Sequence, residues 1–282
     1  SLDDHVLFYN AASLARNDSI SASLINMSFS GNDILKDKDR FEDFGDTPQE
    51  IVGQYMNYPL HVSAGTVPGL QLFNFAFSLI YNVEANAVVS NRVNPVIDLN
   101  YRYDNGFVLG GGFPIAKSGC GKFAVGASAK YIKRSGIDDR FAVVGTRVLD
   151  AIQDGNDAKD VLHNLGMHTD KTWGFDFATE YSCKKTANEF AMSVSLLDVY
   201  TKFDVPDDKT IPQQPMTANV GLSYKLDLGL LSAQFSADVA PINMGLPVSQ
   251  MIHTGFELGT PIISLLTGYG PGGFSYGAEL DL

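Results

Sequence analysis

The chain lacks any run of about 18 consecutive apolar residues, so we expect no membrane-spanning helix. It is also poor in positive charge, since 20 lysines and arginines face 32 aspartates and glutamates, for a formal net charge of −12. Without a basic patch to neutralise phosphates, nucleic acid is not an expected partner. The chain begins at Ser1 without a methionine or an apolar leader, which we interpret as a processed or trimmed product.

Catalytic signatures are missing as well. The histidines are scattered and form no Ser-His-acid grouping, and the run Gly268–Gly273 lacks the lysine and hydroxyl residue of a phosphate loop. We therefore expect a protein that is not an enzyme and needs no cofactor, with a membrane-embedded lipid hydrolase as the alternative. The acidic stretches around Asp33–Asp46 and Asp150–Asp160 are interpreted as a solvated surface rather than a metal site, because they lack a full set of calcium ligands.

The chain is rich in strict apolar–polar alternation. In residues 173–181, Trp173, Phe175, Phe177 and Tyr181 alternate with small or acidic residues, and a period of two with one apolar face predicts a half-buried strand. Glycine (27), phenylalanine (18) and tyrosine (12) also favour β structure. The same alternation occurs in residues 122–131, 190–196, 216–226, 231–239, 252–258 and 274–282.

Two longer stretches, 73–87 and 96–114, each hold one apolar phase throughout. The second contains Asn105-Gly106, a strong hairpin signal. A two-residue turn there would move the following apolar residues to the other face, yet Tyr103, Phe107 and Leu109 keep the same parity. We therefore predict one long strand through 96–114.

Short and long connections alternate along the chain. Val67–Leu70, Lys184–Asn188, Asp227–Leu228 and Gly259–Pro261 are short, whereas Asn32–Gln54, Ser135–Asp170, Lys202–Pro215 and Ala240–Gln250 are long. This asymmetry is typical of outer-membrane barrels. The sequence thus predicts an all-β, transmembrane up-and-down antiparallel β-barrel of about 12 strands (14 possible) over residues 19–282, with residues 1–18 inside or under it. Helices are expected in the external loops, at 48–56 and within 140–166.

Charged residues of both signs occupy the polar, inward-facing parity. They form either a polar pore or a salt-bridged, filled lumen, and the interleaving of signs favours the second. The predicted lumen-lining residues are Asp98, Arg102, Lys122, Lys130, Asp176, Glu180, Lys225, Asp238, Glu257 and Glu279.

The two cysteines flank the strands on either side of the longest loop. If these strands pair, Cys120 and Cys183 lie at the same rim, where a disulfide would fit an oxidising compartment. The alternative is two free thiols at separate turns.

The segment Tyr9-Asn10-Ala11-Ala12-Ser13-Leu14-Ala15 resembles the "NPAGLA" element that precedes the first strand of FadL-type outer-membrane barrels and their TraF-like relatives. Gly121–Asp138 and Gly174–Tyr181 are similar to that family's strands around a helical outer loop. The chain departs from the family at Ala11, where the family has proline, and in strand number. The barrel also resembles porin-like barrels of predatory bacteria that enclose lipid.

These resemblances imply two functions. One is a porin-like barrel of the bacterial outer membrane that binds lipid or hydrophobic molecules and self-associates. The other is a FadL-type transporter of hydrophobic substrates, with the N-terminal segment as a gate. Expected partners are outer-membrane lipids and further copies of the chain, and the identity of any ligand is open. The last strand, Phe274–Leu282, ends on an apolar residue, as such barrels do, and we expect it to pair with Ile20–Leu24.

Overall fold

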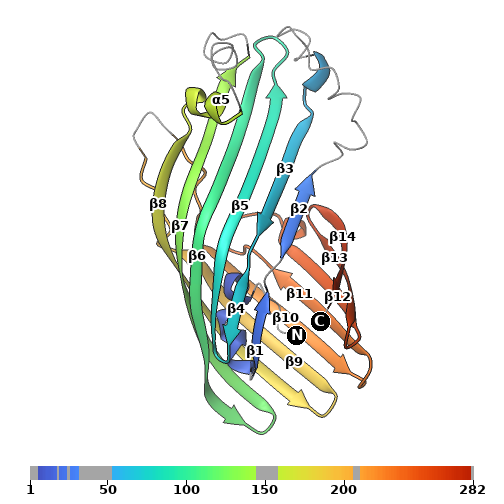
Figure 1. The fold of residues 1–282 in the computed structure, drawn as a ribbon. Coiled ribbons are helices and arrows are strands. Elements are labelled where there is room, and N and C mark those ends of the chain that lie inside the picture. The colour runs from blue at the N-terminus through green and yellow to red at the C-terminus, as the bar shows by residue number, and fades with distance from the viewer. Residues whose placement is uncertain are drawn as a thin grey trace.

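The computed structural model describes residues 6–17, 19–23, 26–31, 53–143, 158–205 and 210–280. In this part of the chain, fourteen antiparallel strands form one sheet that curls into a barrel-like shape (Figure 1). The predicted all-β, antiparallel architecture is therefore confirmed. No helix among the described residues is long and apolar enough to cross a membrane.

The strands follow the order of the chain, and from β4 onward each pairs with the next. Their bounds are β1 (Ile20–Ser23), β2 (Met27–Gly31), β3 (Pro59–Thr66), β4 (Gly69–Leu72), β5 (Phe75–Ser90), β6 (Val96–Ser118), β7 (Gly121–Ala142), β8 (His168–Lys185), β9 (Asn188–Val199), β10 (Thr217–Asp227), β11 (Ser232–Val239), β12 (Ile252–Gly259), β13 (Ile263–Gly270) and β14 (Gly273–Leu280).

Two positions of the sheet are each shared by two strands. β1 pairs with β4 and β2 with β3, while β3 and β4 both pair with β5. The sheet therefore runs through twelve neighbouring positions, in agreement with the predicted number. Its edges are β14 and β1–β2, and no pairing between described residues joins them.

β6 is one continuous strand, as predicted. Asn105 and Gly106 lie inside it, opposite Lys133 and Ile132 of β7, so the hairpin signal is overridden by pairing on both sides. Gly106 fits because of its size, since a Cβ there would lie 1.9 Å from the carbonyl oxygen of Tyr131. By contrast, Phe73 belongs to a turn and has a φ of 53°, so its placement in a strand was wrong.

Several predicted connections need correction. The turn before β5 lies at Phe73–Asn74 rather than at Val67–Leu70, because β3 and β4 run along the same strand. The alternation of lengths is not strict, since β5–β6 and β13–β14 are joined by short segments at the end of the sheet where the other loops are long. The predicted Ser135–Asp170 loop is shorter, because β7 runs to Ala142 and β8 starts at His168.

Helices are few and short. Within the described part of 140–166, the predicted helix is present as α5 (Ala158–Leu165). Phe141 belongs to β7 instead, because its pairing with β6 overrides its helical spacing. Residues 144–157 and 48–52 lie outside the described residues, and 53–55 are helical. α5 packs Val161, Leu162 and Leu165 against the outward face of the long strands, so it covers the outside of the sheet rather than the mouth of the lumen.

Candidate functional site

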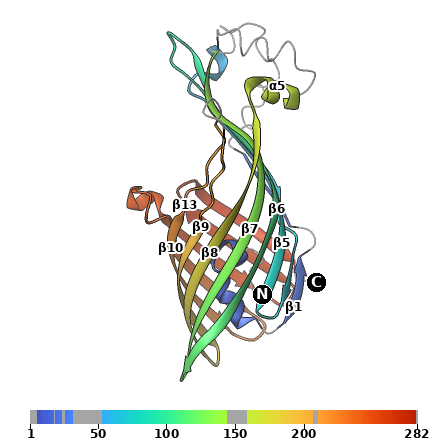
Figure 2. The ribbon, with the colours of Figure 1, turned by 90° about the vertical axis from the view of Figure 1, so that its left-hand side faces the viewer.

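The lumen holds the N-terminal segment, which consists of α1 (Val6–Tyr9) and the 3-10 helix η1 (Ala11–Arg16) (Figure 2). Asn10 separates them and caps η1, since its side-chain oxygen accepts a hydrogen bond from the Ala12 amide at 3.2 Å. The strands approach this segment so closely that side chains are excluded. A Cβ on Gly126 would lie 2.3 Å from the carbonyl carbon of Ala11, and one on Gly112 would lie 2.4 Å from its oxygen.

Glu180 is the main polar anchor of this segment. Its side chain is 2% exposed, accepts a hydrogen bond from Asn10 Nδ2 at 2.7 Å and pairs with Arg16 Nε at 2.8 Å. Arg16 also pairs with Glu189 at 2.6 Å, and the Lys122 ammonium donates to the Ala15 carbonyl. The inward-facing charges of β7, β8 and β9 thus hold the segment in place, because each of them meets an opposite charge or a dipole.

A second segment, formed by the described residues 200–205 and 210–216 between β9 and β10, fills the lumen on the long-loop side. Arg134 of β7 is fully buried and forms a two-point ion pair with Asp104, at 2.6 Å from Nε and 2.7 Å from Nη2. Its remaining donors bind the Pro212 carbonyl at 2.6 Å and the Gln214 side chain at 2.8 Å. The guanidinium also lies 4.6 Å from the centre of the Phe203 ring.

An apolar layer joins the two segments. Leu7 and Leu14 from the N-terminal segment and Phe203 and Ile211 from the β9–β10 connection are at most 2% exposed. They pack in one cluster with wall residues Ala76, Ile80, Val108 and Ile132. Side chains therefore fill this part of the lumen, and the packed cluster leaves no continuous channel through it.

Polar contacts also link the two segments across this layer. Lys130 pairs with Asp176 at 2.8 Å and with Asp198 at 2.5 Å. Asp176 accepts a hydrogen bond from Ser128, which also donates weakly to the Leu7 carbonyl, and Asp198 accepts one from Gln214 at 2.7 Å. The network therefore runs from the N-terminal segment to the β9–β10 connection through β7, β8 and β9.

The structure separates the predicted lumen residues into three groups. Lys122 and Glu180 bind the N-terminal segment, while Lys130 and Asp176 pair with each other and connect to the two filling segments through Ser128 and Asp198. Asp98 and Arg102 lie farther along β6, where they pair with Arg140 and Glu84. The remaining four lie on β10, β11, β12 and β14, away from the two segments, and are Lys225, Asp238, Glu257 and Glu279.

Sequence reasoning missed Arg16, Asp104, Arg134 and Asp198 as parts of the site. Both Asp104 and Arg134 carry the inward parity of their strands. Asp104 lies within the predicted 96–114 strand, and Arg134 could have been found by extending the alternation beyond Lys130. Asp198 lies at the end of β9 with a φ of 61°, and Arg16 lies in a 3-10 helix, so neither has a periodic signal.

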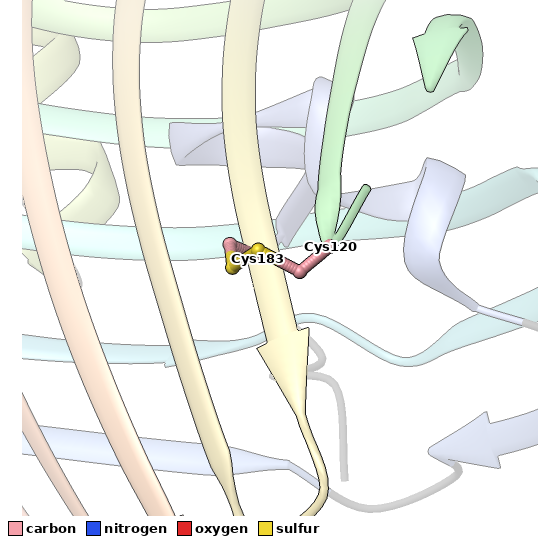
Figure 3. The surroundings of a disulfide bond; sticks show 2 residues. All are labelled: Cys120 and Cys183. Atoms are coloured by element: carbon pink, nitrogen blue, oxygen red, sulfur yellow. A yellow bond between two sulfur atoms is a disulfide. The ribbon is translucent and has the colours of Figure 1, made fainter. Parts of the chain in front are cut away.

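Cys120 and Cys183 form a disulfide at the short-turn rim (Figure 3). Their Cα atoms are 4.8 Å apart, because Gly121 pairs directly with Cys183 at the start of β7. The bond closes the base of the hairpin formed by β7 and β8.

Comparison with family models, with curated proteins and with solved structures finds no match to this chain.

Proposed function

We propose that this chain is a transmembrane β-barrel of the bacterial outer membrane, porin-like but with a filled lumen, that binds lipid on its outer surface and self-associates. The observation that carries the proposal is a broad outward apolar face. Large apolar side chains on this parity are strongly exposed, including Phe29 (77%), Phe274 (80%) and Tyr276 (91%). Soluble monomers rarely expose contiguous apolar patches of this kind, whereas lipid stabilises them.

The strand register supports a lipid-facing belt. Phe107, Tyr131 and Trp173 lie side by side on β6, β7 and β8, and the ring centres of all three pairs are 5.3–5.9 Å apart. Rows of aromatic residues flank the apolar band of outer-membrane barrels. Past Tyr103 the outward face becomes covered by α5, which supports placing the end of the belt there.

The disulfide supports an oxidising compartment, because structural disulfides persist outside the cytosol. Pairing of β14 with β1–β2 also belongs to this proposal. On both edge strands, the outward-facing side chains are apolar and the inward-facing ones are small or polar, so the two edges match in register of faces. Pairing would also satisfy their backbone N–H and C=O groups, which are costly to leave unpaired in lipid.

Self-association and lipid contact are supported by the connection between β11 and β12, which projects from the sheet and contains η3 (Val248–Gln250) (Figure 2). It exposes Ile242, Met244, Leu246 and Val248. A loop that projects from the sheet and exposes apolar side chains can contact a neighbouring copy of the chain or the lipid. Native mass measurement of the full chain should show an oligomer, and Ile242→Ser with Val248→Ser should shift it toward the monomer.

Trp173 is the single tryptophan of the chain and provides the test of the membrane proposal. Its side chain is 50% exposed on the outward face. In vesicles, its fluorescence should be quenched by lipids brominated near the headgroup, and more strongly than by lipids brominated deeper in the acyl chain. Quenching by aqueous iodide without quenching by brominated lipid would contradict the proposal.

The FadL-type transporter is the second candidate, favoured by the N-terminal segment lying within the lumen. A gate of this kind would have to leave its pocket for substrate to pass. A monomer that carries a bound fatty acid in native mass spectra, and loses it when the segment is disturbed, would favour transport over the structural function.

A further inference from the structure

A cavity of about 560 Å³ lies on the sheet beyond Tyr103, and eight of its twelve lining residues carry the inward parity. Strand register arranges eight of its lining residues in two rows that cross β3, β5, β6 and β7. Side chains directly opposite each other on paired strands have Cβ atoms about 4.5–5.5 Å apart, so each row forms a continuous strip. The first row is Pro59, Val88, Asp98 and Arg140, and the second is His61, Asn86, Asn100 and Asp138.

Several groups in these rows have hydrogen-bonding capacity to spare. Arg140 donates to Asp98 through Nε, and its Nη groups have no partner among the described residues. The side chains of Asn100 and Asp138 likewise have none there. The cavity thus presents guanidinium donors, an amide and a carboxylate on adjacent positions of one surface.

Other lining groups are held in fixed orientations. Asn86 Oδ1 accepts a hydrogen bond from His61 Nδ1 at 2.6 Å, and Asn86 Nδ2 donates to Glu84 at 2.9 Å, so the amide is oriented from both sides. Asp98 is held by Arg140 and by Ser90, whose hydroxyl donates to it at 3.2 Å. Such preorganisation lowers the entropy that a ligand would have to remove on binding.

We propose that this cavity binds a neutral saccharide. Its volume lies within the range of about 300–1,000 Å³ that small-molecule sites occupy. Carboxylates accept hydrogen bonds from vicinal hydroxyls, while guanidinium and amide groups donate to them. Val88 and Pro59 offer apolar surface to the C–H face of a sugar ring. Asp98 is already paired with Arg140, and Asp138 and Asp139 also line the cavity, so the lining disfavours an anionic ligand. The site does not depend on the membrane proposal, which the Trp173 measurement tests separately.

The test uses the full chain in a detergent without a sugar headgroup. Saturation-transfer NMR would be run with chitobiose, lactose and maltotriose, followed by titration of any sugar that binds. Asp138→Ala should weaken binding by about tenfold, since it removes a charged hydrogen-bond acceptor.

Glu257→Ala is the matched control, because this glutamate also carries the inward parity but lies on β12, outside the cavity lining, and should leave the affinity within about twofold. Binding of none of the three sugars would overturn the proposal. Equal weakening by both variants, or binding only of a cationic amine such as spermidine, would overturn it as well.

Discussion

Replacing Glu180 should release the N-terminal segment from the lumen. The carboxylate is 2% exposed and binds both Asn10 and Arg16. Removing one partner of a buried pair typically costs about 3–5 kcal/mol. Arg16 is 27% exposed and keeps its pair with Glu189, so the lower end of about 3 kcal/mol applies to Glu180→Ala. That free energy corresponds to roughly a hundredfold rise in the population of the released segment.

Ser13→Cys provides the reporter for this prediction. Ser13 is 3% exposed in η1, and the chain has no free cysteine among its described residues, so a maleimide reagent would label this thiol alone. In the Ser13→Cys background, Glu180→Ala should raise the labelling rate about a hundredfold when exposure of the segment limits the reaction.

Glu257→Ala is the matched control in the same background. This glutamate also carries the inward parity, but it lies on β12, away from the segment. Equal labelling rates for Glu180→Ala and Glu257→Ala, or fast labelling of Ser13→Cys without a second substitution, would refute the conclusion that Glu180 holds the segment in the lumen.

Three further predictions concern stability. Replacing both Cys120 and Cys183 by serine removes a cross-link between residues that are 63 positions apart, and the chain-entropy estimate predicts a loss of about 4 kcal/mol in unfolding free energy. A reductant should cause the same loss of heat stability in the parent chain and have no effect on the variant. Arg134→Met leaves Asp104 buried without its cation and should cost about 3–5 kcal/mol in urea unfolding, whereas adding Asp104→Leu should restore much of it; an additive second loss would contradict the pairing. Burial raises the pKa of Glu84, but the Asn86 hydrogen bond and Arg102 outweigh it, so the net pKa lies below the ordinary 4.5. The ionised form therefore stabilises the fold above pH 4.5, and the stability difference between the parent and Glu84→Gln should shrink as pH falls through the lowered pKa; a difference that grows in that range would contradict the assignment.

The strands were predictable because each carries its own alternation. In β8, Trp173, Phe175 and Phe177 define the outward face without any knowledge of neighbours, and the structure retains this parity. Strand ends were less predictable. Phe141 fits both a helical and an extended pattern, and only pairing with Ile97 of β6 decides between them.

The filling of the lumen was predictable only in part. Interleaved charges such as Lys130 and Asp176 indicate that inward residues neutralise each other across strands, and they do. Which segments enter the lumen depends on how their side chains pack against the wall, and not on the alternation of apolar and polar residues along the sequence. Phe203 and Gln214 lie in an irregular connection. Both are positioned by Arg134, whose guanidinium stacks near the Phe203 ring and donates a hydrogen bond to the Gln214 side chain.

One network of hydrogen bonds and ion pairs links the two filling segments, and this bears on how any passage could open. Ser128 binds Asp176 and contacts Leu7 of the N-terminal segment, while Asp198 receives Gln214 from the β9–β10 connection. Lys130 joins the two aspartates. Because substitutions within one network have non-additive effects on stability, release of one segment should weaken the binding of the other segment in the lumen. A solute crossing the lumen would have to displace both, so a transport function requires a coupled movement, whereas a structural function uses the same network to keep the lumen filled.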